Sequence, residues 1–379
     1  MKNYIVKNGR VILRDRILTD TIIVVENGKI KEITTDSQNQ PDYKIIDAQG
    51  HYVSPAFVEL HIHGCEDFSI ESGEEDILEK ICGFLQKRGI NTFVPSIQCK
   101  ENILAITAAE LKSKKFLQEF IPGIYVEGPF VNPKKRGGIL PEFVKAVDLD
   151  YLEKLIEISH DFIKMMTAAP ELEGSRELIE SLLKENIIPC YGHSDCELKD
   201  IHKFKGSSRF NITHLFNAMS TIDHKRSGLA MLPFIDREIF FELNCDGVHL
   251  SPEIIKLCYE NLNHERMILI SDAVISAGKA HGCYKYYEKE VISDGNGVRY
   301  KDNNILIGAN CLVNDVMKKF IGFTGAPIEK AVQFVTYNPC KLLGIENKKG
   351  SIKTGKDADL IIFDDEFNII RNLGGYQDE

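Results

Sequence analysis

The chain reads Pro55-Ala56-Phe57-Val58-Glu59-Leu60-His61-Ile62-His63-Gly64 from residue 55 to residue 64. This apolar run predicts a buried strand, and two histidines stand one residue apart at its end, before a glycine interrupts it. At the end of a strand the pleat is lost, so the side chains of His61 and His63 can converge on one point. Two converging imidazoles favour a metal site, provided that the rest of the chain supplies partners for them.

Apolar runs continue to alternate with amphipathic helical patterns after residue 53. Eight runs predict strands, at 53–61, 92–97, 123–127, 163–168, 188–192, 210–214, 239–244 and 267–272. Helical patterns separate most of them, at 74–88, 101–120, 148–159, 176–185 and 252–261. Eight β-then-α units over about 220 residues predict a (β/α)8, TIM-like barrel. The alternative is a doubly wound open sheet, but its usual Gly-x-Gly-x-x-Gly after the first strand is missing.

Both ends of the chain differ from the predicted barrel region, because they consist of short β-rich runs separated by turns. The first fifty residues contain the turn signals Asn8-Gly9 and Asn27-Gly28, and residues 350–363 return to a strand pattern. We expect these ends to pair in one small β-sandwich-like domain, formed by residues 1–52 and 346–379. Residues 53–345 then form the catalytic barrel, which a hairpin-like segment at 284–307 interrupts.

Composition narrows the class of protein. The chain has 379 residues, a formal net charge of −10 and ten cysteines without a C-x-x-C pair. The acidic balance disfavours nucleic acid as a partner, and no apolar run reaches the roughly 18 residues of a membrane span. Reduced thiols and the absence of a leader-like start favour a cytoplasmic protein.

The carboxyl ends of barrel strands converge on one mouth, so the residues at each predicted end form a candidate site. Four histidines and two carboxylates stand there: His61, His63, Glu127, His193, His214 and Asp272. This donor set suits one or two divalent cations such as Zn²⁺, Fe²⁺ or Mn²⁺. Such an ion activates water and polarises a carbonyl, as amide hydrolysis requires. Asp272 is then the expected acid–base residue, and Glu127 would bridge the ions if two are present.

Several motifs together resemble one known family. They are the run 55–64, Glu127-Gly128-Pro129-Phe130, Gly192-His193-Ser194, Thr213-His214-Leu215-Phe216-Asn217-Ala218-Met219, Asp246-Gly247-Val248-His249, Ser271-Asp272-Ala273 and the stretch 350–360. The set resembles the N-acetylglucosamine-6-phosphate deacetylases of the amidohydrolase superfamily. The resemblance covers nearly the whole chain, in order.

The resemblance implies a role for each matching position. Glu127, His193 and His214 correspond to the ligands of an obligatory metal, and His61 and His63 to the extra pair of two-metal members. Asp272 corresponds to the catalytic acid–base, which assists attack of a metal-bound hydroxide on the N-acetyl group. The substrate-binding positions that the resemblance implies are Asn217, Ala218, His249, Lys225 and Arg226. Lys225 or Arg226 would reach the phosphate of a neighbouring subunit, so a homodimer is implied.

The sequence also departs from the family pattern. Ile139 stands about where the family usually has a polar residue, often histidine, that touches the sugar. N-acetylglucosamine-6-phosphate is the expected substrate. The alternatives are another N-acetylhexosamine phosphate such as N-acetylgalactosamine-6-phosphate, another amide cleaved by the same metal chemistry, or a non-enzymatic assembly protein. The intact set of six ionisable residues argues against the last.

Overall fold

Eight parallel strands form one sheet in the computed structural model, which describes residues 3–36, 43–201 and 209–375. In chain order they are β6 (Phe57–Ile62), β9 (Ile90–Gln98), β10 (Ile124–Glu127), β11 (Ile163–Ala168), β12 (Ile188–Tyr191), β13 (Asn211–Ile212), β14 (Phe240–Asn244) and β15 (Met267–Ile270). Beyond β15, Ala273 bridges Ile62 in parallel, and the Asp272 amide donates to His61 O at 3.0 Å, which closes the sheet. The predicted (β/α)8 barrel is confirmed.

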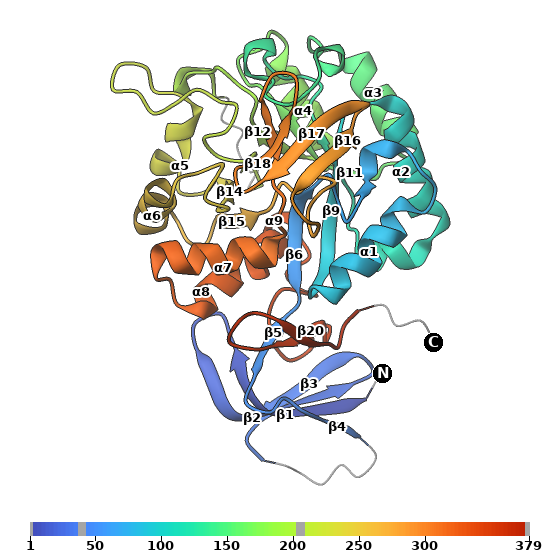
Figure 1. The fold of residues 1–379 in the computed structure, drawn as a ribbon, viewed down its shortest axis with the longest axis vertical. Coiled ribbons are helices and arrows are strands. Elements are labelled where there is room, and N and C mark those ends of the chain that lie inside the picture. Colours follow the sequence, from blue (N-terminus) through green and yellow to red (C-terminus); the bar gives the residue numbers. More distant parts are fainter. Residues whose placement is uncertain (1–2, 37–42, 202–208, 376–379) are drawn as a thin grey trace.

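The strands are buried on both sides, as parallel barrel strands are. Every residue of β6 is buried, and so is every residue of β9 and β10. Helices surround the sheet (Figure 1), and they are α1 (Ile77–Lys87), α2 (Glu101–Ser113), α3 (Leu149–Ile158), α4 (Ser175–Lys184), α5 (Leu232–Ile235), α6 (Pro252–Asn261), α7 (Val313–Thr324), α8 (Ile328–Phe334) and α9 (Tyr337–Leu343). Local chemistry fixes some helix starts: Asp148 caps α3 by accepting from the Tyr151 amide, and Ser251 caps α6, where Pro252 takes the first turn.

A second sheet lies below the barrel, at the amino-terminal ends of its strands (Figure 1). Its strand order is β21-β20-β5-β1-β2-β3, and β4 also pairs with β1. The members are β1 (Tyr4–Ile12), β2 (Ile17–Glu26), β3 (Lys29–Thr34), β4 (Lys44–Asp47), β5 (Tyr52–Pro55), β20 (Leu360–Phe363) and β21 (Ile369–Asn372). Because β20 pairs antiparallel with β5, both ends of the chain share this sheet. The domain limits at residues 52 and 346 stay a prediction.

An insertion after β15 lies over the opposite end of the barrel (Figure 1). It is a four-stranded antiparallel sheet of β16 (Gly282–Tyr286), β17 (Lys289–Asp294), β18 (Gly297–Tyr300) and β19 (Leu306–Gly308), so the hairpin-like segment has two strands more than a single hairpin. A short hairpin, β7 (Gly64–Cys65) with β8 (Phe68–Ser69), follows β6. The insertion contributes the wall of a cavity at the barrel mouth, described below.

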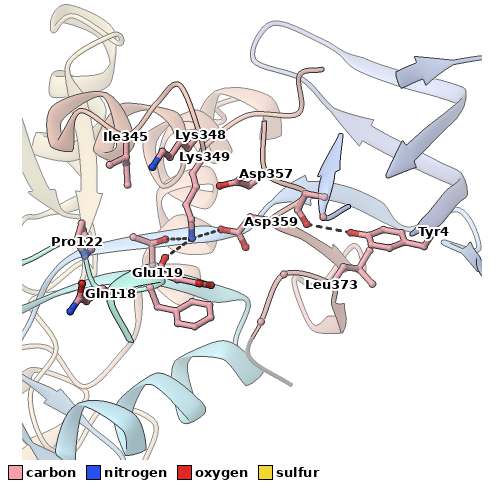
Figure 2. Close-up of a pocket in the computed structure, with 16 residues that line it drawn as sticks. Tyr4, Gln118, Glu119, Pro122, Ile345, Lys348, Lys349, Asp357, Asp359 and Leu373 are labelled. Carbon is pink, nitrogen blue, oxygen red and sulfur yellow. Dashed lines mark hydrogen bonds and ion pairs between the residues drawn. The ribbon is translucent and has the colours of Figure 1, made fainter. Parts of the chain in front are cut away.

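A largely buried ion pair joins the barrel to the lower sheet. Lys349 Nζ lies 3.1 Å from Asp359 Oδ2 and donates to Glu119 O at 2.9 Å. Figure 2 shows these contacts in the lining of a cavity of about 610 Å³. Over the described part of the chain, no helix has the length and apolar character needed to cross a membrane.

Candidate metal centre and active site

The six ionisable residues predicted from strand ends are brought together at the barrel mouth, and all are buried. The least buried is Asp272, at 8% exposed, and His61 is fully buried. Two groups of possible metal ligands result, His61 with His63 and Glu127, and Glu127 with His193 and His214. Glu127 belongs to both groups.

The group around His193 has the geometry of a cation site. His193 Nδ1 lies 2.9 Å from Lys135 O, and because a carbonyl only accepts, Nδ1 carries the proton and Nε2 presents a lone pair. That Nε2 lies 3.0 Å from Glu127 Oε1 and 3.0 Å from Nε2 of His214, while His214 Nε2 is also 3.0 Å from Glu127 Oε1. Lone pairs this close repel each other unless a proton or a cation lies between them. Two imidazoles and a carboxylate suit a divalent ion such as Zn²⁺.

The group around His61 repeats this arrangement. His61 Nδ1 lies 3.1 Å from Glu242 Oε2, so this carboxylate holds the Nδ1 proton and turns Nε2 toward the mouth. His61 Nε2 lies 3.3 Å from Nε2 of His63, and His63 Nε2 lies 3.4 Å from Glu127 Oε2. Within this group His63 lies against Glu127 Oε2, whereas His61 Nε2 lies 3.8 Å from Oε1, the oxygen that also faces His193 and His214. Because Glu127 belongs to both groups, the residues fit two ions that share it.

Electrostatics favour positive charge in this site. Burial raises the pKa of Glu127, but hydrogen bonds from His193, His214 and His63 outweigh burial and hold it well below its usual range. Burial lowers the pKa of His61, yet Asp272 and Glu242 raise it to about 10. Histidine hydrogen bonds thus outweigh desolvation at Glu127, and carboxylates outweigh it at His61; a site with ionised carboxylates favours a bound cation.

Asp272 faces the mouth from the end of β15. Its Oδ1 lies 3.5 Å from His63 Nε2 and 3.6 Å from His61 Nε2, and its Oδ2 lies 3.9 Å from His249 Nε2. Its carbonyl accepts from the Ala309 amide at 2.9 Å, which ties the residue to the insertion. The carboxylate can therefore reach a water held at either ligand group.

Four site residues adopt left-handed backbone conformations, which side chains other than glycine rarely occupy. The φ angles are 46° for His193, 29° for His214, 49° for Ala218 and 55° for Asp272. Such conformations are strained and concentrate at functional sites. Here they turn the chain sharply at the strand ends, where the ligands point into the mouth.

A cavity of about 220 Å³ opens directly above the two ligand groups. Three of the sequence-predicted substrate positions, Asn217, Ala218 and His249, line it. Asp246 Oδ2 lies 2.7 Å from His249 Nδ1 and so orients this imidazole. Ile139 is also in the lining, and it contributes an apolar surface there.

Lys225 and Arg226 are not brought to this cavity within the chain. Arg226 Nε donates to Glu197 Oε1 at 3.0 Å, and its NH2 nitrogen donates to Asp195 O at 2.8 Å. Lys225 is exposed, and its backbone amide donates to Asp223 Oδ1. Both residues lie on a surface loop. Within the part of the chain that the structure describes, neither contacts the active site of its own chain.

Sequence reasoning missed three polar residues around the ligands, namely Glu242, Glu71 and Gln98. Glu242 orients His61 and accepts from the His214 amide at 3.0 Å, while Glu71 Oε1 lies 4.0 Å from His63 Nδ1. Burial raises the pKa of Glu71 to about 7. One signal was present: Glu242 is a lone charge inside the apolar run Phe240-Phe241-Glu242-Leu243, and buried charges need partners.

Comparison with known proteins shows the family of this chain. Residues 52–375 match the Amidohydrolase family, so the chain belongs to that family. It is therefore a hydrolase acting on an amide, as the sequence predicts, and the family is typically dependent on divalent metal ions.

Three relatives indicate which members of this family the chain resembles. N-acetylglucosamine-6-phosphate deacetylase of Bacillus subtilis (strain 168) is 27% identical over 98% of this chain and 96% of its own length. N-acetylgalactosamine-6-phosphate deacetylase of Escherichia coli O157:H7 is 24% identical over 97% of this chain and 96% of its own length. A solved N-acetylglucosamine-6-phosphate deacetylase from Thermotoga maritima superposes with a TM-score of 0.83 at 26% identity, over 98% of both chains. The predicted resemblance to these deacetylases is confirmed.

Proposed function

We propose that this chain removes the acetyl group of N-acetylglucosamine-6-phosphate, giving glucosamine-6-phosphate and acetate. The observation that carries the proposal is the pair of three-residue ligand groups that share Glu127, with Asp272 facing both. The substrate is inferred from relatives that align over nearly the whole chain and are N-acetylglucosamine-6-phosphate deacetylases.

Each residue has a distinct part in the proposed reaction. Glu127, His193 and His214 would hold one divalent ion, and His61 and His63 with Glu127 a second. Such an ion lowers the pKa of water and polarises a carbonyl when bound. Asp272 takes the proton from the attacking water and returns it to the nitrogen of the leaving amine as the C–N bond breaks.

The remaining predicted residues bind the sugar phosphate. Asn217 and Ala218, which line the cavity, would contact the sugar, and His249, held by Asp246, would lie near the phosphate. Lys225 or Arg226 would reach the phosphate in a neighbouring subunit of a homodimer, which fits their absence from the cavity lining of their own chain. Lys225 would bind the phosphate through a single charged ammonium group, whereas Arg226 would donate two parallel hydrogen bonds from its guanidinium group. The cytoplasm is the proposed location, because such substrates are intermediates of amino-sugar metabolism.

A second candidate substrate is N-acetylgalactosamine-6-phosphate. Two observations favour it: a relative of that name aligns over 97% of the chain, and apolar Ile139 lines the cavity where the family usually has a polar side chain.

Acetate release tests these alternatives directly. The enzyme, loaded in turn with Zn²⁺, Fe²⁺ or Mn²⁺, is given N-acetylglucosamine-6-phosphate, its galacto epimer, and unphosphorylated N-acetylglucosamine. The proposal expects the highest kcat/KM for the first substrate and little turnover of the third. A higher kcat/KM for the galacto epimer selects the second candidate, and turnover that does not depend on phosphate rejects both.

A further inference from the structure

Gln98 ends β9 beside a metal-ligand position, although the proposed reaction gives it no part. It pairs directly with Glu127 in the parallel register of β9 and β10, so the two side chains emerge on the same face of the barrel. Gln98 is 6% exposed and belongs to the lining of the active-site cavity. A buried amide at this place needs hydrogen-bond partners.

The two ends of the Gln98 amide differ in their surroundings. The Leu140 amide donates to Gln98 Oε1 at 3.4 Å, so the carbonyl end already has a partner within the chain. The Gln98 backbone amide donates to Glu71 Oε1 at 2.6 Å, which fixes the main chain. Among the described residues, no acceptor lies within hydrogen-bond distance of Gln98 Nε2. This nitrogen is also open to solvent, because it is missing from the set of fully buried, unpaired polar atoms. Gln98 Nε2 is therefore a hydrogen-bond donor that is free to bind a ligand.

Two other side-chain nitrogens of the lining, Asn217 Nδ2 and His249 Nδ1, already have partners within the chain. Asn217 Nδ2 lies 3.3 Å from His214 O and 3.4 Å from Leu215 O, and His249 Nδ1 is held by Asp246. Ile139 and Ile307, which also line the cavity, have no polar side-chain atom. Gln98 thus supplies a neutral donor on a wall where its neighbours supply none.

We propose that Gln98 Nε2 donates a hydrogen bond to the carbonyl oxygen of the scissile amide, an inference that rests on the proposed function. The amide must lie next to Glu127, because the two groups of residues that would hold the water-activating ions share this carboxylate. As water adds to the carbonyl carbon, the π electron pair moves onto this oxygen, and the water proton passes to Asp272. The pair returns when the C–N bond breaks and the amine takes the proton. A donor that faces the oxygen binds it most strongly while it carries negative charge, so it raises kcat more than it lowers KM.

The test replaces the amide with a side chain of similar shape. Gln98→Met keeps an unbranched chain but removes the donor. Gln118→Met is the matched control, because Gln118 lines the cavity at the other end of the barrel (Figure 2). With N-acetylglucosamine-6-phosphate, we expect Gln98→Met to lower kcat by about 100-fold with KM within about threefold, as for loss of an oxyanion donor. Metal content and Tm stay near those of the wild type, and Gln118→Met keeps the wild-type kcat.

A second substrate separates a contact with the oxygen from general disturbance of the site. The N-trifluoroacetyl analogue stabilises negative charge on its own oxygen, so the loss in Gln98→Met should shrink to less than about tenfold. Equal losses on both substrates, unchanged kcat, or a rise in KM alone would each overturn the proposal. If Gln98→Met folds poorly, Gln98→Asn, which withdraws the donor by one methylene, decides in the same assay. Wild-type enzyme that releases no acetate contradicts the proposed function instead.

Discussion

Asp272 is held in place by its backbone as well as by its neighbours. Its φ of 55° is unusual for a side-chain residue, its amide donates to His61 O, and its carbonyl accepts from Ala309. These contacts fix the carboxylate about 3.5 Å from the nitrogen of His63 without a direct hydrogen bond. A carboxylate in that position has room for a water and can move its proton.

Asp272→Asn tests this role. Asparagine keeps the size of the side chain but cannot accept the proton, so we expect kcat to fall by about 10³-fold or more. The metal content should stay near that of the wild type, because the two ligand groups do not include Asp272. Acetate release and metal analysis of the same sample measure both. Full activity in this variant would assign the proton transfer to another residue.

His63 belongs to one ligand group only, so its loss should cost one metal ion before it costs the fold. We expect His63→Ala to bind about one equivalent less metal than the wild type, because Glu127, His193 and His214 remain. Metal analysis after dialysis, with Tm as the folding readout, makes the measurement. His224→Ala is the control, since His224 is exposed on a loop. Unchanged metal content in His63→Ala would contradict a second site.

His249 gives the proposed substrate binding a pH dependence. Burial lowers the pKa of His249, but its hydrogen bond to Asp246 and the charges of Asp246 and Asp272 outweigh this and raise the pKa above its usual value. The imidazole is protonated below the raised pKa, so binding of an anionic phosphate should weaken as pH rises through it. In Asp246→Asn the pKa falls, and KM should begin to rise at a lower pH.

KM measured from about pH 6 to pH 9 for both enzymes tests this shift. The phosphate itself is mainly a dianion above about pH 6, so its own titration contributes equally to the two profiles. If the KM profiles of the two enzymes coincide, protonation of His249 does not contribute to phosphate binding.

At the level of elements, the insertion β16–β19 is connected to the catalytic residue through Gly308. A Cβ on Gly308, which has a φ of +149°, would lie 2.6 Å from Asp272 O and 2.7 Å from Val274 Cγ1. The insertion and the end of β15 therefore depend on the absence of a side chain there. Leu306 and Ile307 on the same strand line the active-site cavity.

Gly308→Ala should disturb this contact. We expect a loss of about 1–3 kcal/mol in stability, as for overpacking, and a kcat lowered by about tenfold because Asp272 moves with its backbone. Gly295→Ala, in the turn between β17 and β18, is the matched control, since a Cβ there meets no atom within 4 Å. Urea unfolding and acetate release measure the two effects. Equal behaviour of the two variants would show that the contact is dispensable.

Sequence patterns predicted the elements well for a physical reason. Barrel strands are buried on both faces and end where the pleat is lost, so both the apolar runs and the polar residues that follow them are visible in one dimension. Glu242 was missed because it lies inside β14. Gln98 was missed although it ends β9, because it follows the predicted strand 92–97 and carries no charge. Which face such a residue takes, and which neighbour it meets, depends on the register between strands, as in the pairing of Gln98 with Glu127. The extra strands of the insertion depend likewise on contacts with the barrel mouth.

At the scale of the whole molecule, the catalytic end of the barrel and the lower sheet are separate in space but joined by β5 and β6, which run consecutively through the chain. Lys349 and Asp359 stabilise the junction. Besides Asp359 Oδ2, Lys349 contacts Thr92 Oγ1 and Glu119 O, and Asp359 Oδ1 accepts from Asn91 at 2.6 Å. Burial lowers the pKa of Lys349, but Asp359 outweighs burial and raises this pKa above its usual value, so Lys349 keeps its charge.

Lys349→Met should therefore destabilise the fold without changing the chemistry. The variant leaves the Asp359 carboxylate, 12% exposed, without its cation, and breaking a buried pair in this way costs about 3–5 kcal/mol. Lys29→Met is the control: its ion pair with Asp357 is also near the junction, but the side chains are 58% and 36% exposed, so the expected cost is about 0–1 kcal/mol. Urea titrations give the two free energies of unfolding, and kcat of the folded enzymes should equal that of the wild type. If Lys349→Met is no less stable than Lys29→Met, the junction does not depend on this pair; if its kcat falls while it remains folded, the lower sheet influences the active site through the barrel.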